Sequence, residues 1–169
     1  MSNFWGAVQF LFSFYTRGMS FIDMAYLKKS DLKNGTITYR RRKTGQQLTV
    51  KWEKCMEDII AKYGENTATR YLLPIITNPC SDERTQYRNA ICRINVALKE
   101  VAGLAGLNIP LTMHVARHCW ASVAKSKNIP LSVISEGMGH DSEETTRIYL
   151  ASLDTSVVDK ANSLILKDF

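Results

Sequence analysis

Hydrophobic side chains fill the first segment of the chain and then recur at helical spacing along most of its length. Residues 4–15 are almost entirely apolar, which predicts a buried helix that ends near Gly18. We expect Phe10, Leu11 and Phe14 to face the protein interior. The same aromatic run could instead form the surface that receives a partner.

A short helix and a β-hairpin are predicted next. Residues 20–23 resemble a capping box, so a second helix should run to about Lys28. After a turn at residues 34–35, side chains alternate between two faces over residues 36–43 and again over residues 47–52. These two strands would form a hairpin with a basic tip.

The rest of the chain is predicted to be helical around one loop. Met56, Ile59, Ile60 and Tyr63 recur with a period of 3.6 residues, whereas residues 77–84 carry the Asn, Pro and Ser of a loop. Further helices are predicted over residues 82–105, 112–127, 131–138, 143–150 and 156–166. The sequence has neither repeats nor an internal linker, which favours one mainly α domain (α+β class) with a small sheet.

Composition favours an ordinary globular domain with a basic balance. Of the 169 residues, 45% are hydrophobic and 22% are charged, and the 22 Lys and Arg against 16 Asp and Glu give a formal net charge of +6. These values argue against disorder and against a disulfide-rich miniprotein. The apolar run is shorter than the ~20 residues that span a bilayer, and it does not have the form of a signal peptide. We therefore expect a cytoplasmic protein with reduced cysteines and no membrane partner.

The most distinctive chemistry belongs to two histidines, an arginine, a tyrosine and a lysine. His114 and Arg117 are three residues apart, on one helix face. Tyr149 follows His140 by nine residues, and Lys43 belongs to the basic hairpin tip, which permits a nucleic-acid partner. Such a set suits metal-free chemistry on a phosphodiester. Cations neutralise the phosphoryl oxygens, tyrosine can be a covalent nucleophile, and lysine can protonate a leaving oxygen.

The order of these motifs resembles that of the tyrosine recombinases, the phage-integrase family. Their catalytic domain ends with H-x-x-R, then G-H, then T-x-x-x-Y, and this chain reads His114-Val-Ala-Arg117, Gly139-His140 and Thr145-Thr-Arg-Ile-Tyr149. The resemblance covers residues 10–166, and residues 16–21 and 41–44 look like the branch carried by conjugative transposons of Bacteroides-type bacteria. It implies the mainly helical fold of DNA breaking-rejoining enzymes over residues 1–169, without the N-terminal DNA-binding domain of the family.

The resemblance also implies a role for each residue of the set. Tyr149 would attack the scissile phosphate, leaving a 3′-phosphotyrosyl bond and a free 5′-hydroxyl. Arg117 would hold the non-bridging oxygens. His114 would bond to the phosphate and could act as a base. His140 would position the phosphate or the tyrosine, and Lys43 would be the general acid. The phosphotyrosine keeps the bond energy, so neither a metal nor another cofactor is implied.

One position departs from the family pattern. Ser20 stands where the family has its first catalytic arginine. We expect Arg41 to replace the missing guanidinium, because strand alternation places it on the same face as Lys43. Arg17, about one turn before Ser20, is the second candidate. Asp23 matches the acidic position that supports the site in the family.

Double-stranded DNA is the partner that the resemblance implies, in the bacterial cytoplasm and at the nucleoid. Relatives assemble as a tetramer on DNA, and the isolated domain is expected to be a monomer. Apolar residues at helical spacing in residues 154–169 predict a helix that packs either on its own domain or on a neighbour. The target sequence, the host element and the direction of the reaction are not encoded in these motifs.

Other interpretations of the same residues remain open. Taken singly, Tyr149 would more often be a core tyrosine, and only the ordered set favours catalysis. His114 and His118 have the spacing of a zinc pair, but Val115 stands where a zinc protease has glutamate, so we expect no metal. His118 is interpreted as a satisfied packing histidine. The rival functions are a type IB topoisomerase and a DNA-binding module that is catalytically silent because of Ser20.

Overall fold

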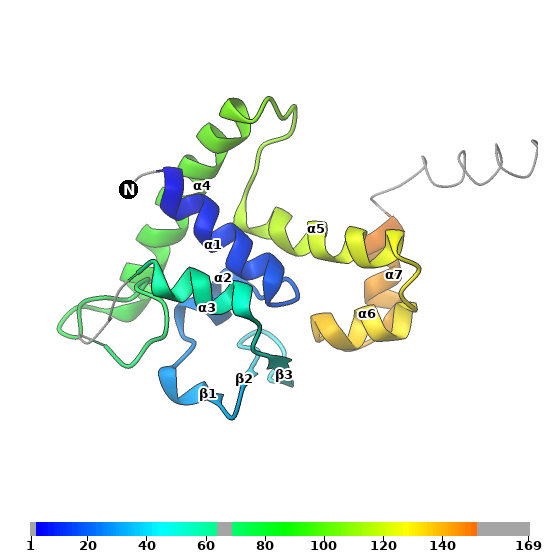
Figure 1. Cartoon of the computed structure of the whole chain (residues 1–169), viewed down its shortest axis with the longest axis horizontal. Coiled ribbons are helices and arrows are strands. Elements are labelled where there is room, and N and C mark those ends of the chain that lie inside the picture. The colour runs from blue at the N-terminus through cyan, green and yellow to red at the C-terminus, as the bar shows by residue number, and fades with distance from the viewer. Residues whose placement is uncertain (1–2, 64–68, 152–169) are drawn as a thin grey trace, which may run out of the picture.

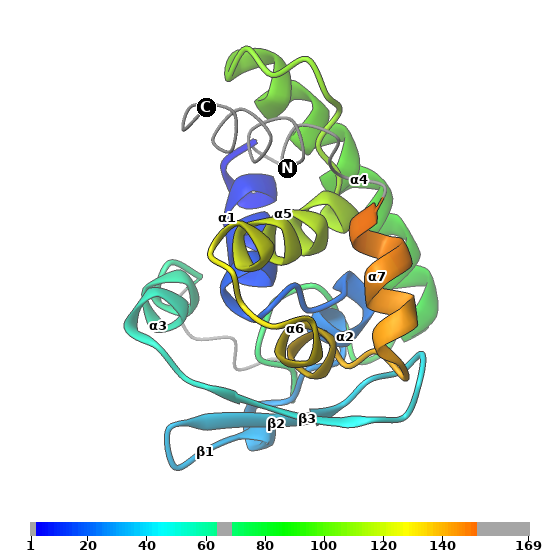
Figure 2. The same cartoon turned by 90° about the vertical axis from the view of Figure 1, so that its right-hand side faces the viewer.

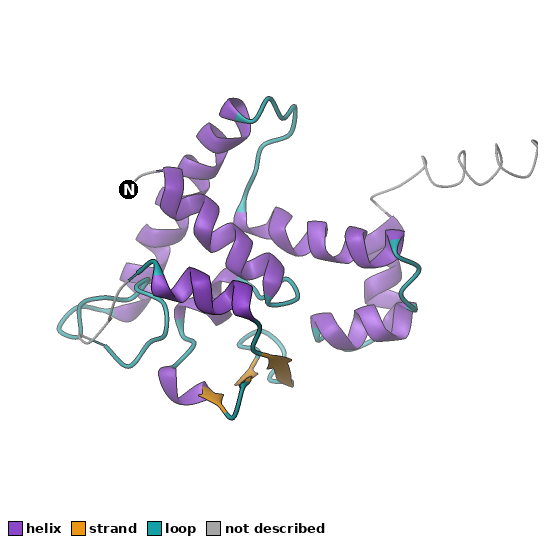
Figure 3. Ribbon diagram, in the orientation of Figure 1, coloured by secondary structure: helices purple, strands orange, loops and turns teal. Residues whose placement is uncertain are grey.

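The chain folds as a group of helices with one small antiparallel sheet at its edge (Figure 1). The structure is a computed structural model, and it describes residues 3–63 and 69–151. Its helices are α1 (Asn3–Tyr15), α2 (Phe21–Ala25), α3 (Lys54–Ala61), α4 (Glu83–Leu104), α5 (Met113–Ser126), α6 (Leu131–Met138) and α7 (Glu143–Ala151), and a 3₁₀ turn spans Lys29–Asp31. Its strands are β1 (Leu32–Lys33), β2 (Thr36–Arg40) and β3 (Gln47–Lys51), in the order β1-β2-β3 (Figures 1 and 3). The mainly α, α+β prediction is confirmed.

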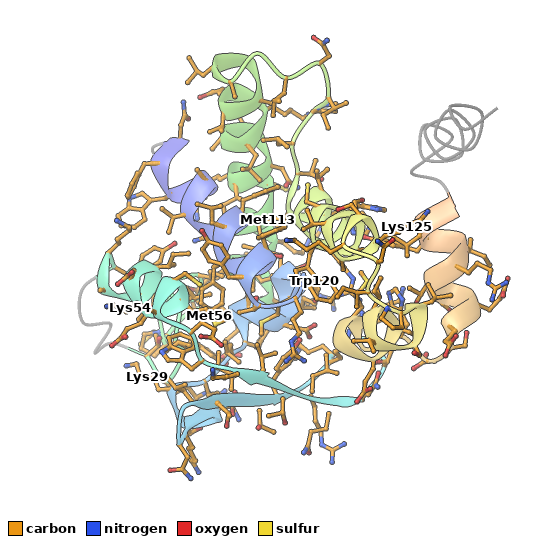
Figure 4. The ribbon with its side chains drawn as sticks, turned by 45° about the vertical axis from the view of Figure 1, so that its right-hand side comes forward. Lys29, Lys54, Met56, Met113, Trp120 and Lys125 are labelled. Carbon is orange, nitrogen blue, oxygen red and sulfur yellow. The ribbon has the colours of Figure 1, made fainter. Side chains whose placement is uncertain are left out.

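Two hydrophobic cores share the helix α5. The larger core lies around α1, which packs against α3, α4 and α5 (Figure 1). The smaller core joins the second half of α5 to α6 and α7 through Ala121, Ile134, Met138 and Leu150. Figure 4 shows the division along α5, since Met113 belongs to the larger core and Trp120 packs against the smaller one.

The sheet brings the β2–β3 hairpin close to the end of α6. Alternate residues of the two strands, Ile37, Tyr39, Leu48 and Val50, are buried in the larger core. Figure 2 shows the hairpin running beneath α6 toward the start of α7. Packing of the sheet thus places the basic tip, from the first third of the sequence, beside helices from the last third.

The hairpin tip differs from its prediction. β2 ends at Arg40, so Arg41 and Lys43 belong to the turn rather than to the strand. The turn is closed by hydrogen bonds from the Arg41 N–H to the Gln46 carbonyl and from the Gly45 N–H to the Arg41 carbonyl. Within this turn Arg41 is buried, whereas Lys43 is exposed.

Two other predictions about the first third were wrong in detail. Helix α2 ends at Ala25, before Lys28, because Lys28 leaves the helix to pair with Tyr71 in an antiparallel bridge. In α1 the buried side chains include Val8 and Phe12, whereas Leu11 is 42% exposed. Phe12, rather than Leu11, therefore faces the interior at this point of the helix.

Most of the remaining helices lie within one or two residues of their predicted bounds. Helix α4 begins after Asp82, whose carboxylate accepts the Thr85 N–H. Thr112 precedes α5 but makes no capping bond, and Asn95 accepts the Met113 N–H instead. The helix predicted over residues 156–166 lies outside the described residues. In the described part of the chain no helix is both long and apolar enough to cross a membrane, and the four cysteines are free.

Candidate active site

A cavity of about 410 Å³ opens where the hairpin tip, α2, α5 and α7 converge. It is lined by Ser20, Arg41, Lys43, Thr44, His114, Arg117, His140, Asp141, Thr145 and Tyr149. The predicted set of Lys43, His114, Arg117, His140 and Tyr149 is therefore together in one place. Lys43 comes from the first third of the sequence and the other four from the last third, so only the tertiary structure makes them neighbours.

Arg117 is held at the floor of the cavity by two backbone carbonyls. Its side chain is 6% exposed, and its Nη1 and Nη2 donate to the carbonyl oxygens of Gly18 at 2.7 Å and Met138 at 2.6 Å. Burial, with the neighbouring charge of Arg41, lowers the pKa of Arg117 to about 10. The guanidinium remains protonated at neutral pH, and its orientation is set before any ligand binds.

Gly18 makes this approach possible. Its φ is +70°, and a Cβ there would lie 2.8 Å from the Cα of Arg117. Any side chain at this position would push the loop away from α5. Gly18, which the sequence predicted to end the first helix, therefore also allows Arg117 to pack against the loop.

Arg41 is the second buried guanidinium of the cavity. It is 7% exposed, its Nη1 donates to the Gly139 carbonyl, and its Nε lies 4.0 Å from a carboxylate oxygen of Asp23. Arg17 instead lines a separate cavity with Trp120 and other residues of α5 and α6. Of the two candidates for the missing guanidinium, only Arg41 lines the same cavity as Arg117.

Asp23 connects Ser20 to the hairpin tip. The Ser20 hydroxyl donates to one carboxylate oxygen of Asp23 at 2.6 Å, and the Arg42 N–H donates to the other at 2.8 Å. Asp23 is buried, so these donors replace the water that the carboxylate loses. Its supporting role, predicted from the family pattern, therefore has a structural counterpart: it anchors the turn that carries Arg41.

His140 is oriented by a buried threonine. Its Nδ1 lies 2.7 Å from the hydroxyl oxygen of Thr146, which has no solvent exposure, and its backbone N–H donates to the Ser135 carbonyl. Burial lowers the pKa of His140 to about 4, and the charges of Arg117 and Arg41 act in the same direction. The ring is neutral at pH 7, with Nδ1 already engaged. Sequence reasoning did not single out Thr146, whose role depends on the turn of α7.

The Tyr149 ring lies among the three histidines of the chain. His118 stacks on it with ring centroids 4.0 Å apart and planes 3° apart. His114 and His140 meet it edge-on, with centroids 6.1 Å and 5.7 Å away. Burial raises the pKa of the Tyr149 hydroxyl to about 12, so the phenol keeps its proton at neutral pH.

The prediction for His118 was only half right. The ring is packed, but its Nδ1 is buried and makes no hydrogen bond within the described residues. The i, i+4 spacing from His114 was the available sequence signal, because it places both rings on one face of α5. The described residues include no group of three or more His, Cys, Asp or Glu placed to hold a metal ion.

The cavity combines positive charge with neutral hydrogen-bonding rings. Lys43 is exposed at its rim. Partial burial lowers the pKa of His114, and the charges of Arg117 and then Lys43 act in the same direction. Three cationic side chains thus face a space that also contains two neutral imidazoles and a phenol. Such a site can hold an anion with a phenolic oxygen beside it.

Comparison with known proteins gives a family and a fold. The model of the Phage integrase family matches residues 7–156. The structure is similar to that of XerA recombinase, with 19% identity and a TM-score of 0.64, over 97% of this chain and 62% of that one. It is also similar to XerH site-specific recombinase bound to palindromic difH substrate in a post-cleavage complex, with 19% identity and a TM-score of 0.66, over 94% and 45% of the two chains.

A third similar structure is a lambda integrase (75–356) dimer bound to a COC′ core site. The identity is 19% and the TM-score is 0.59, over 86% of this chain and 51% of that one. The chain spans less than two thirds of each of these three proteins. No curated protein gives a significant match.

Proposed function

Because the chain belongs to the phage integrase family, we propose that it carries the catalytic domain of a tyrosine recombinase, which cuts and rejoins duplex DNA at specific sites. One observation carries the proposal: a single cavity is lined by Lys43, His114, Arg117, His140 and Tyr149. These are the residues that the family motifs assign to the reaction, and their types match the needs of phosphoryl transfer without a metal.

The reaction would begin with attack of the Tyr149 oxygen on the scissile phosphorus. A bond forms between that oxygen and phosphorus while the bond from phosphorus to the 5′ oxygen breaks. The phenolic proton passes to His114, whose lowered pKa leaves it neutral and able to accept one. Lys43 delivers a proton to the departing 5′ oxygen. The product is a 3′-phosphotyrosyl ester, which a second 5′-hydroxyl can reopen by the reverse steps.

The two buried guanidinium groups would stabilise the charge that grows on the phosphoryl oxygens. Arg117 and Arg41 are already fixed by backbone carbonyls, so little reorganisation is needed when the phosphate enters. In this proposal Arg41 supplies the guanidinium that Ser20 cannot. His140 would hold the phosphate from the other side, with its Nδ1 bound by Thr146.

The partner in this proposal is duplex DNA. XerH and lambda integrase have both been solved bound to DNA sites. In this proposal the basic hairpin tip of this chain contacts DNA phosphates. We propose that several copies assemble on DNA, since exchange of two duplexes needs four cleaved strands. The isolated domain would bind DNA weakly, with an affinity that falls as salt is added.

The test is capture of the covalent intermediate. The chain is incubated, in EDTA, with nicked duplexes taken from the DNA on either side of its own gene, and the products are separated on a denaturing gel. A protein band shifted by the attached strand is expected, and it should disappear in Tyr149→Phe. The rescue of activity by added Mg²⁺, or an adduct that survives Tyr149→Phe, would contradict the mechanism.

A catalytically silent DNA-binding module is the second candidate. The observation that favours it is Ser20, whose hydroxyl is occupied by Asp23 and offers no positive charge to a phosphate. The same experiment separates the two functions. Salt-sensitive binding of the duplex without any adduct would identify the silent module.

A further inference from the structure

A face-to-face ring contact of Tyr149 within the described residues involves a residue outside the family motifs. His118 and Tyr149 stack face to face, with centroids 4.0 Å apart and planes 3° apart. Both side chains are half-buried. Tyr149 lines the cavity of the candidate site, whereas His118 is not among the lining residues. His118 therefore does not line the cavity itself but contacts two residues that do, Tyr149 by the stack and His114 with ring centroids 4.6 Å apart.

The stack leaves the phenol little rotational freedom. One face of the Tyr149 ring is covered by His118, and the rings of His114 and His140 lie at 85° and 68° to it, with centroids 6.1 Å and 5.7 Å away. The ring is also packed against the smaller core, which fixes α7 on α5 and α6. A tyrosine has only two side-chain torsions, so contacts with the surrounding rings restrict where its oxygen lies.

The contact depends on the face of the imidazole rather than on its nitrogens. The rings are nearly parallel, and Nδ1 of His118 is buried with no hydrogen-bond partner in the described part of the chain. Burial, together with the charges of His114 and Arg117, lowers the pKa of His118, so the stacked ring is neutral at pH 7. A neutral aromatic ring of another kind should be able to replace it.

We propose that His118 is the positioning residue of the nucleophile, whose ring face holds the Tyr149 oxygen at the phosphate cavity. This inference rests on the proposed function, because the position of Tyr149 matters for cleavage only if Tyr149 is the nucleophile. It assigns His118 no contact with DNA and no proton transfer. His118 acts by restricting Tyr149 to the orientation from which attack can occur.

The kinetic test compares His118→Ala with His118→Phe. Cleavage of the nicked duplex is followed in a single turnover at saturating DNA, and the DNA Kd is measured separately. His118→Ala should slow adduct formation by roughly threefold to tenfold, the size of a lost aromatic pair, with Kd unchanged. His118→Phe should restore most of the rate, because the phenyl ring can cover the same face of Tyr149.

Trp120→Phe is the matched control for a general loss of packing. Trp120 lies on the same helix and packs against the same smaller core, but it lines the separate cavity near Arg17. It should lower the melting temperature as much as the His118 variants do, without slowing adduct formation. A cleavage rate that simply follows the melting temperature in all three variants would overturn the proposal.

A spectroscopic measurement reports the stack without relying on activity. The chain is labelled with 3-fluorotyrosine, and the ¹⁹F signal that disappears in Tyr149→Phe identifies Tyr149. The signal should shift in His118→Ala and return toward its original position in His118→Phe. An unchanged signal in His118→Ala would overturn the inference, as would a shifted signal with a wild-type cleavage rate. If the wild-type chain forms no adduct at all, the proposed function itself fails.

Discussion

The guanidinium of Arg41 donates a hydrogen bond to the carbonyl oxygen of Gly139, which joins the hairpin tip to the end of α6. Arg117 donates to the preceding carbonyl, that of Met138. Two cations can lie this close because the C-terminal end of a helix carries partial negative charge and unpaired carbonyl groups. The next residue is His140, so both arginines also fix the backbone from which this histidine projects.

Replacement of Arg41 by alanine should impair the covalent step far more than replacement of Arg17. Loss of one preorganised donor to a transition-state oxyanion costs roughly 10²-fold to 10³-fold in rate. We expect a loss of that size for Arg41→Ala in the adduct assay. Arg17→Ala should cleave at nearly the wild-type rate, because Arg17 lines another cavity. Near-wild-type cleavage by Arg41→Ala would show that no second guanidinium is needed.

Gly139→Ala should destabilise the fold by more than the strain of a positive φ alone would. The φ of Gly139 is +63°, and a Cβ there would lie 2.8 Å from both Arg41 Cδ and Leu48 Cδ1. A positive φ costs a non-glycine residue about 1–2 kcal/mol, and overpacking adds about 1–3 kcal/mol. Gly45→Ala is the control, since its φ is +74° and its Cβ would meet nothing within 4 Å. Urea unfolding should show the larger loss for Gly139→Ala, and equal losses would argue against the close contact.

Stability should fall as the solution is acidified from about pH 6.5 toward pH 4. The pKa of His140 is about 4 in the folded chain, below its ordinary value of 6.5, so the unfolded chain binds the extra proton in this range. The lowered pKa values of His114 and His118 act in the same direction. Thermal melting at a series of pH values should show this trend, with a shallower slope in His140→Gln. An identical slope in that variant would exclude His140 as a source of the effect.

Thr146→Val should weaken both the fold and the site. The substitution removes the hydroxyl that lies 2.7 Å from His140 Nδ1 and leaves that nitrogen without its buried partner. Such a loss costs about 1–3 kcal/mol, and His140 would no longer be held toward the phosphate. We expect a lower unfolding free energy and slower adduct formation. Thr38→Val, which removes an exposed hydroxyl contact with Thr49 on the sheet, should change neither quantity appreciably.

Local patterns in the sequence determined most of the helices and the residue set of the site. Helix α6 was predicted with its observed bounds, because Pro130 and Gly139 mark its two ends. His114 and Arg117 were predicted on one face of α5 from their spacing alone. These features depend on interactions within a few turns of backbone, which a linear pattern can record.

Contacts between distant segments were decided only by the tertiary structure. Arg41, and not Arg17, lines the cavity of the candidate site because the hairpin turn that carries Arg41 packs against the end of α6. The stack of His118 on Tyr149 requires α5 and α7 to be held at one separation by the smaller core. Helix α2 ends early because Lys28 forms an isolated antiparallel bridge with Tyr71, far along the chain. In each case the energy comes from partners that are remote in sequence, and no periodicity within one segment can identify them.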